Sequence, residues 1–160
     1  MTVTVGARQP GGRPLHPNGN TDWCVVPFTS IDETTPHFDT NAVIYPCAES
    51  DFTLWNFTEG ETEVQSAGAP NLCLKSWHTT FGHGDQAFGS YNGATLRVSS
   101  CGDIMSGIPI TKWIVEGDRF RAANSPNNQC LDLTAGILDT GRNLQTWECT
   151  EGNANQVWTF

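Results

Sequence analysis

Six cysteines are the residues whose type and spacing most directly limit the chemistry of this sequence. They are widely separated and contain no Cys-x-x-Cys pair: Cys24, Cys47, Cys73, Cys101, Cys130 and Cys149. A structural zinc site usually takes its ligands from close pairs of cysteines, whereas cysteines in an oxidising compartment form disulfides. The spacing therefore favours disulfides over zinc, but it leaves the pairing open.

The last third of the chain carries side chains suited to a ligand rich in hydroxyl groups. Asp132 stands between Leu131 and Leu133, so strand alternation sends both leucines to the core and the carboxylate to the opposite face. A carboxylate accepts several charge-assisted hydrogen bonds, enough for two neighbouring hydroxyls. Gln145 and Trp147 alternate in the same way, and an indole offers a flat apolar surface beside these polar groups.

Composition and charge argue against two classes of partner. The chain has 160 residues with 8 Lys+Arg against 17 Asp+Glu, a formal net charge of −9, which repels phosphate backbones and anionic lipid headgroups. No apolar run approaches the roughly 18 to 20 residues of a transmembrane helix, and residues 1–6 lack the features of a signal peptide. We expect a soluble chain in processed form, with no nucleic-acid partner and no membrane insertion.

Motifs for catalysis or metal binding are weak. His78, His83 and Asp85 fall in a glycine-punctuated stretch that we interpret as a solvated loop rather than a metal site. No Gly-x-Ser-x-Gly motif appears, and no carboxylate pair stands in a recognisable glycosidase frame. We expect no catalytic residue, no metal and no cofactor.

The elements that must position these residues are short strands. With 16 Gly and 9 Pro and only 16% charged residues, the composition disfavours long solvent-facing helices. Turn signals such as Asn92-Gly93 and Thr140-Gly141 separate apolar runs. In three places large apolar side chains recur at every second residue, the period of a strand with one buried face: Trp55 and Phe57, Trp113 and Val115, Trp158 and Phe160.

The same order of residues recurs three times along the chain. Each unit contains an apolar residue, a first cysteine, a second cysteine and a closing polar-x-Trp-x-apolar step. The unit length varies, so insertions fall in loops, chiefly at residues 79–86 and 102–108. Because each unit is too small for its own core, we predict one pseudo-threefold, all-β domain in which Trp55, Trp113 and Trp158 pack centrally.

At these residues the sequence resembles the ricin B-chain type of lectin domain, whose repeats each end in a Gln-x-Trp motif. Gln156-Val-Trp158 matches the motif, while Thr53-Leu-Trp55 and Thr111-Lys-Trp113 keep only the tryptophan. The stretch Leu15-His-Pro-Asn-Gly-Asn20 also resembles small fungal members of the family.

The resemblance implies a β-trefoil of twelve strands over residues 13–160, after an N-terminal extension at residues 1–12. The repeats would span approximately residues 13–60, 61–117 and 118–160. It also implies one disulfide inside each repeat: Cys24–Cys47, Cys73–Cys101 and Cys130–Cys149.

A binding repeat in this family uses five positions, and the third repeat matches all of them. The resemblance therefore implies a site for galactose or N-acetylgalactosamine, with Trp147 as the stacking surface, made by Asp132, Gln145, Trp147, Asn155 and Gln156. The other repeats depart from the pattern, which predicts that they do not bind galactose, although Tyr45 keeps an aromatic surface. Their equivalent residues are Val26, Val43 and Tyr45, and Lys75, Arg97 and Ser99.

The leading hypothesis is a secreted, disulfide-bonded, non-catalytic lectin whose partners are galactose-containing glycans. With one site per chain, cross-linking of cells would require an oligomer such as a homodimer. Asn56-Phe-Thr58 is the one N-x-S/T sequence, which makes Asn56 a candidate for glycosylation. Two alternatives are a trefoil protease inhibitor acting through the 79–91 insertion and a polysaccharide-targeting module of a glycoside hydrolase.

Overall fold

The computed structural model describes residues 12–28, 40–76, 91–102, 112–123 and 128–160. His78, His83 and Asp85 lie outside the described residues, as do residues 1–11 of the extension and residues 79–90 of the insertion. In the described residues, regular structure consists of strands and single turns of 3-10 helix, which confirms the all-β prediction. None of the helical turns in this part of the chain is long and apolar enough to cross a membrane.

The elements follow one another in three similar groups. The first group is β1 (Arg13–Pro14), β2 (His16–Pro17), β3 (Trp23–Pro27), β4 (Thr40–Pro46), η1 (Asp51–Thr53) and β5 (Leu54–Asn56). The second is β6 (Gly60–Thr62), β7 (Gln65–Ser66), β8 (Leu72–Ser76), β9 (Ala94–Ser100) and β10 (Trp113–Glu116). The third is β11 (Arg119–Ala122), β12 (Gln129–Leu133), η3 (Thr134–Gly136), β13 (Arg142–Glu148), η4 (Ala154–Gln156) and β14 (Trp158–Thr159).

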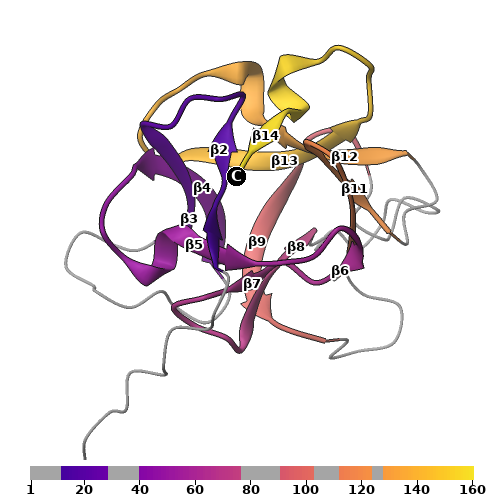
Figure 1. The fold of residues 1–160 in the computed structure, drawn as a ribbon. Coiled ribbons are helices and arrows are strands. Elements are labelled where there is room, and N and C mark those ends of the chain that lie inside the picture. Colours follow the sequence, from indigo (N-terminus) through magenta and orange to yellow (C-terminus); the bar gives the residue numbers. More distant parts are fainter. Residues whose placement is uncertain (1–11, 29–39, 77–90, 103–111, 124–127) are drawn as a thin grey trace, which may run out of the picture.

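Two of the expected twelve strands are each divided into two short segments, so the described residues contain 14. Both divisions occur where a strand changes partner. In the first group β1 pairs with β5, whereas β2 pairs with β14. In the second group β6 pairs with β10, whereas β7 pairs with β5 and β8. In Figure 1 the indigo-to-purple, magenta-to-pink and orange-to-yellow thirds of the chain surround a common centre.

Three antiparallel hairpins share one register, which places equivalent residues of the three groups at equivalent points. The first cysteine of each hairpin pairs with the stacking position: Cys24 with Tyr45, Cys73 with Ser99 and Cys130 with Trp147. Two residues further along, the pairs are Val26 with Val43, Lys75 with Arg97 and Asp132 with Gln145. The positions compared from the sequence alone are therefore equivalent in space.

The three closing tryptophans are buried in the core, as predicted, and each makes the same hydrogen bond. The indole Nε1 donates to the carbonyl of the residue that follows the first cysteine: Trp55 to Val25 at 2.9 Å, Trp113 to Leu74 at 3.0 Å and Trp158 to Leu131 at 3.0 Å. Each bond ties the last strand of a group to its hairpin, because donor and acceptor are at least 27 residues apart in the chain.

The three predicted disulfides are present: Cys24–Cys47, Cys73–Cys101 and Cys130–Cys149. A backbone hydrogen bond of 2.9 Å accompanies each disulfide. The N–H of the second cysteine donates to the carbonyl of the residue that lies two positions before the first cysteine, which is Asp22, Asn71 or Asn128. Since all six sulfurs are in disulfides, none is a thiolate that could ligate a metal. Closing loops of 19 to 28 residues stabilises each hairpin by roughly 3 kcal/mol in the chain-entropy view.

A ring cluster closes one end of the core and joins the first described strand to the last residue. Phe57, Phe120 and Phe160 pack edge to face, with ring centroids 5.0 to 5.9 Å apart. The Arg13 guanidinium lies 4.3 Å from the centroid of Phe57 and 4.7 Å from that of Phe160. Such cation–π contacts favour a fixed position for the chain end.

Replacing Trp113 by Phe should lower the free energy of unfolding by roughly 2 kcal/mol, because it removes buried ring volume and leaves the Leu74 carbonyl without its donor. Urea denaturation with the disulfides intact would measure this loss. The control is Trp147→Phe, at a position 41% exposed, where we expect a change below about 0.5 kcal/mol. Equal losses in the two variants would contradict the role given to the indole hydrogen bond.

Candidate functional site

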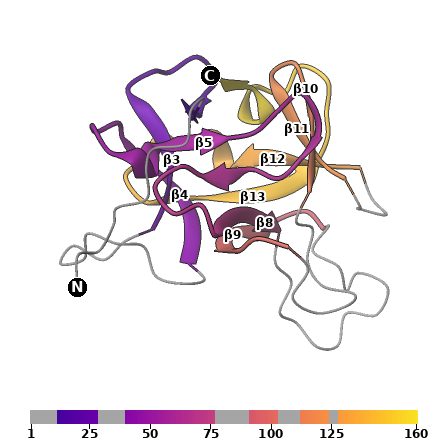
Figure 2. The same cartoon turned by 60° about the horizontal axis from the view of Figure 1, so that its bottom comes forward.

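The β12–β13 hairpin places three of the five predicted residues on its outer face. Asp132 and Gln145 are a register pair, and the Gln145 Nε2 donates to the Asp132 Oδ1 at 2.9 Å. Leu131, Leu133 and Leu144 point into the core, so alternation puts Asp132, Gln145 and Trp147 on the other side. Figure 2 shows β12 and β13 side by side, with β4 next along the sheet.

A single helical turn brings Gln156 against the same carboxylate. The Asn153 Oδ1 accepts a hydrogen bond from the Asn155 backbone N–H at 3.0 Å and so starts η4. The buried Gln156 then donates from Nε2 to the Asp132 Oδ2 at 3.2 Å and to the Glu148 carbonyl at 2.9 Å. Its Oε1 accepts from the Thr150 N–H at 3.0 Å, which fixes the orientation of the amide.

Each oxygen of the Asp132 carboxylate thus accepts a hydrogen bond from a different glutamine. An ionised carboxylate offers about four acceptor positions, so two such bonds leave capacity for ligand hydroxyls. The residue is only 2% exposed, and this burial raises the pKa of Asp132 above its ordinary 3.8, while the hydrogen bonds from Gln145 and Gln156 act in the opposite direction. The site is an oriented, partly desolvated hydrogen-bond acceptor.

A kink after β12 lies beside the last of the five residues, Asn155. Ala135 and Gly136 have φ values of +58° and +64°, in the left-handed region. A Cβ added to Gly136 would lie 2.4 Å from the Asn155 Oδ1, so the backbone passes close to this amide. Nothing local in the sequence marks Gly136 as part of the site, because its closeness to Asn155 arises only when η3 and η4 pack together.

A turn from the second group supports the site from the side. The Asn92 Oδ1 accepts hydrogen bonds from the Glu148 N–H at 2.7 Å and from the Gln129 Nε2 at 3.1 Å. A Cβ added to Gly93, which has φ +89°, would lie in ordinary van der Waals contact with the Trp147 ring, at 3.9 Å. Asn92-Gly93 was recognised in the sequence only as a turn, since nothing local indicates which strand it supports.

The structure therefore links Asp132, Gln145 and Gln156 directly by hydrogen bonds. Trp147 follows on the same face of β13 and is 41% exposed, while Asn155 lies beside the kink at Gly136. This arrangement combines a fixed anionic acceptor, amide donors and an accessible aromatic surface.

The equivalent places in the other two hairpins have different chemistry. Val26 and Val43 are apolar, and Lys75 is buried with its Nζ donating to the Gly102 carbonyl at 2.9 Å. The Arg97 Nη1 donates to the Asn41 Oδ1 at 3.0 Å. Neither hairpin has a carboxylate at the position of Asp132.

Known proteins resemble this chain in sequence family and in fold. The sequence model of the ricin-type beta-trefoil lectin domain matches residues 29–158. No curated protein sequence matches the chain. Among solved structures, a mosquitocidal holotoxin is similar with a TM-score of 0.68 and 16% identity; the alignment covers 94% of this chain but only 17% of the holotoxin chain.

Two smaller proteins match over nearly their whole length. A ricin B-like lectin of Macrolepiota procera, in complex with lactose, has a TM-score of 0.60 and 17% identity, with 92% of each chain covered. The C-half of an earthworm R-type lectin, in complex with GalNAc, has a TM-score of 0.57 and 13% identity, with 85% of this chain and 87% of that chain covered. Identities this low relate the folds alone. Because the family match spans most of the chain, and the strands and disulfides follow the same plan, this chain belongs to the ricin-type β-trefoil lectin family.

Proposed function

We propose that this chain is a non-catalytic lectin that binds terminal galactose or N-acetylgalactosamine through the third repeat. The observation that carries the proposal is the Asp132 carboxylate, held by two glutamine amides on the outer face of a hairpin that also presents an exposed indole. Lactose and GalNAc in the two similar lectins support this class of ligand.

The polar groups of the site suit the hydroxyls of a galactose ring, and the indole suits its C–H face. The carboxylate would accept two neighbouring hydroxyls, and the Asn155 amide would both donate and accept. The axial 4-hydroxyl of galactose leaves a broad C–H face for stacking on Trp147. With few polar groups and one stacking surface, we expect a dissociation constant for a monosaccharide on the order of 1 mM, about −4 kcal/mol.

Secretion and valency belong to the same proposal. Three disulfides suit an oxidising compartment, so we propose a secreted protein. One sugar site per chain would allow agglutination only by a homodimer or larger assembly.

Replacing Asp132 by Asn should weaken galactose binding at least about tenfold, because a charge-assisted acceptor becomes a neutral amide of similar shape. NMR titration with methyl β-galactoside and a glycan array would measure the loss. The control is Asp118→Asn, an exposed aspartate in the β10–β11 turn that leaves the site unchanged. Full binding by the Asp132→Asn protein would remove the third repeat from the proposal.

Acidification should weaken galactose binding at a higher pH than an ordinary aspartate would predict. The sugar binds the ionised carboxylate, and burial raises the pKa of Asp132 above 3.8, so protonation removes the acceptor as the pH falls through that raised value. Fold stability should respond in the opposite sense: the Asp132 contribution decreases as the pH rises from about 3.8 through the raised pKa. Sugar titration and urea denaturation at several pH values, on wild type and on Asp132→Asn, would test the binding and the stability expectation respectively. An identical pH profile for the two proteins would contradict the assignment of the pH dependence to Asp132.

Replacing Gln156 by Met should reduce both stability and sugar binding, because the Thr150 N–H and the Glu148 carbonyl lose their partner and the carboxylate loses one donor. We expect Gln156→Met to lower the free energy of unfolding by about 2 to 4 kcal/mol. Gln145 donates from its side chain to Asp132, and Gln145→Met should weaken sugar binding with a smaller stability loss. Urea denaturation and NMR titration of both variants separate the two roles, and equal stability losses would contradict the anchoring role of Gln156.

A further inference from the structure

The first disulfide differs from the other two in its surroundings. Cys47 is exposed, whereas Cys101 and Cys149, the second cysteines of the other disulfides, are only partly exposed. The imidazole Nδ1 of His16 lies 3.8 Å from the Cys24 Sγ and 3.7 Å from the Cys47 Sγ. A ring nitrogen therefore stands beside both sulfurs of a disulfide that solvent reaches.

A second contact shows where the proton of His16 lies. The same Nδ1 is 2.8 Å from the Trp23 carbonyl oxygen. A carbonyl oxygen only accepts hydrogen bonds, so Nδ1 must carry a hydrogen and donate it. The neutral ring and the imidazolium both meet this condition, so the two sulfurs lie beside an N–H donor in either charge state.

Acceptor oxygens, rather than a donor, lie beside the second disulfide. The Glu63 Oε2 lies 3.8 Å from the Cys73 Sγ, and the Pro70 carbonyl oxygen lies 3.7 Å from the Cys101 Sγ. A carboxylate disfavours a second negative charge nearby, and therefore a thiolate at either sulfur. This disulfide should resist opening by a thiol.

Burial of the first cysteine does not distinguish the three disulfides, because each of these residues is at most 2% exposed. Burial opposes the charge of a thiolate, so a sulfur leaving from such a position benefits from a nearby donor. Among the described His, Asp and Glu side chains, only His16 and Glu63 cluster with disulfide sulfurs. At the third disulfide Arg121 pairs in register with Cys130, and its Nη2 donates to the Glu116 Oε1 at 3.3 Å.

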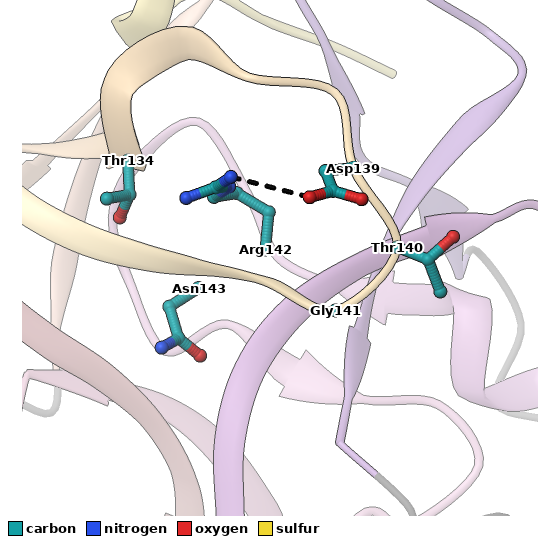
Figure 3. A pocket seen from close by; sticks show the side chains of 6 residues that line it. All are labelled: Thr134, Asp139, Thr140, Gly141, Arg142 and Asn143. Carbon is teal, nitrogen blue, oxygen red and sulfur yellow. Dashed lines mark hydrogen bonds and ion pairs between the residues drawn. The ribbon is translucent and has the colours of Figure 1, made fainter.

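The strands around the first disulfide have other connections that would hold them if it opened. β3 and β4 are joined along five register pairs. β4 is also tied to the third repeat, since the Gly141 N–H donates to the Ile44 carbonyl at 2.9 Å. Figure 3 shows the turn that contains Gly141, with the ion pair between Arg142 and Asp139 across it. The disulfide can therefore open while the sheet stays folded.

We propose that Cys24–Cys47 is a thiol-exchange site, which an external dithiol opens in preference to the other two disulfides. A thiolate of the dithiol attacks the exposed Cys47 Sγ, the bond between the two cysteines breaks, and Cys24 leaves as a thiolate that accepts a hydrogen bond from the His16 Nδ1. None of these groups belongs to the candidate sugar site.

The second thiol of the reagent completes the exchange. It displaces Cys47 from the mixed disulfide, so the dithiol is oxidised to a disulfide and two electrons pass to the protein. The two protons of the dithiol reach the two cysteines by way of water. The Cys47 thiol then has an acceptor in place, because the Thr21 carbonyl oxygen lies 3.4 Å from its Sγ.

Timed reduction of the native protein with dithiothreitol, quenched with N-ethylmaleimide and followed by peptide mass mapping, gives the opening rate of each disulfide. We expect Cys24–Cys47 to open at least about threefold faster than either of the others, because its leaving thiolate is stabilised. Far-UV circular dichroism should keep the native spectrum at that stage. A smaller lead, a different first disulfide or simultaneous opening of all three overturns the proposal.

Two substitutions test the part played by His16. His16→Phe keeps a ring but removes the donor, and it should slow the opening of Cys24–Cys47 at least about threefold without changing the other two rates. His16→Asn returns an amide N–H close to the position of Nδ1 and should keep the rate within about twofold of wild type. An unchanged or faster rate in His16→Phe, or an equally slow rate in both variants, overturns the role of the N–H donor.

The matched control is Glu63→Gln at the second disulfide. A neutral amide in place of the carboxylate should speed the opening of Cys73–Cys101 and leave the rate at Cys24–Cys47 unchanged. A rate at Cys73–Cys101 that does not rise contradicts the influence of neighbouring groups on which the proposal rests.

Discussion

The hydrogen bond from a tryptophan indole to the carbonyl beside a cysteine is the contact on which the rest of this molecule depends. It occurs three times with nearly the same length, from Trp55, Trp113 and Trp158. Each repeat lacks the apolar area for its own core, so the bond and the ring around it fix the last strand against the hairpin and against the other two repeats. Each disulfide then closes the outer side of the same hairpin.

The candidate sugar site uses this framework directly. Trp158 donates to the Leu131 carbonyl, so the residue next to Leu131, Asp132, is set on the outer face. Gln156 lies two residues before Trp158 and therefore arrives beneath the same carboxylate. Along β12, the core residue Leu131 thus alternates with the candidate site residue Asp132, and a shift of this strand by one residue would exchange them.

Sequence reasoning predicted most of the fold because its signals were local or repeated. Strand periodicity at the tryptophans, the cysteine order and the resemblance together predicted the all-β class and all three disulfides. The resemblance to the lectin family implied Asp132, Gln145 and Gln156 as members of one set, and these three side chains do meet in the structure. Sequence reasoning missed Gly136 and the support from Asn92 and Gly93, because those contacts join segments whose proximity depends on packing between elements.

The support that Asn92 and Gly93 give to β13 means that the repeats are not independent in function. The backbone N–H of Glu148, next to Trp147 in the third repeat, donates to Asn92 in a turn of the second repeat. That second repeat has Lys75 at the position equivalent to Asp132. Likewise, Gly141 of the third repeat lies beside Tyr45 of the first, where an added Cβ would be 3.9 Å from the tyrosine hydroxyl. A substitution in one repeat can therefore alter the candidate site of another, and the third repeat excised from the chain would lack the hydrogen bonds to Asn92.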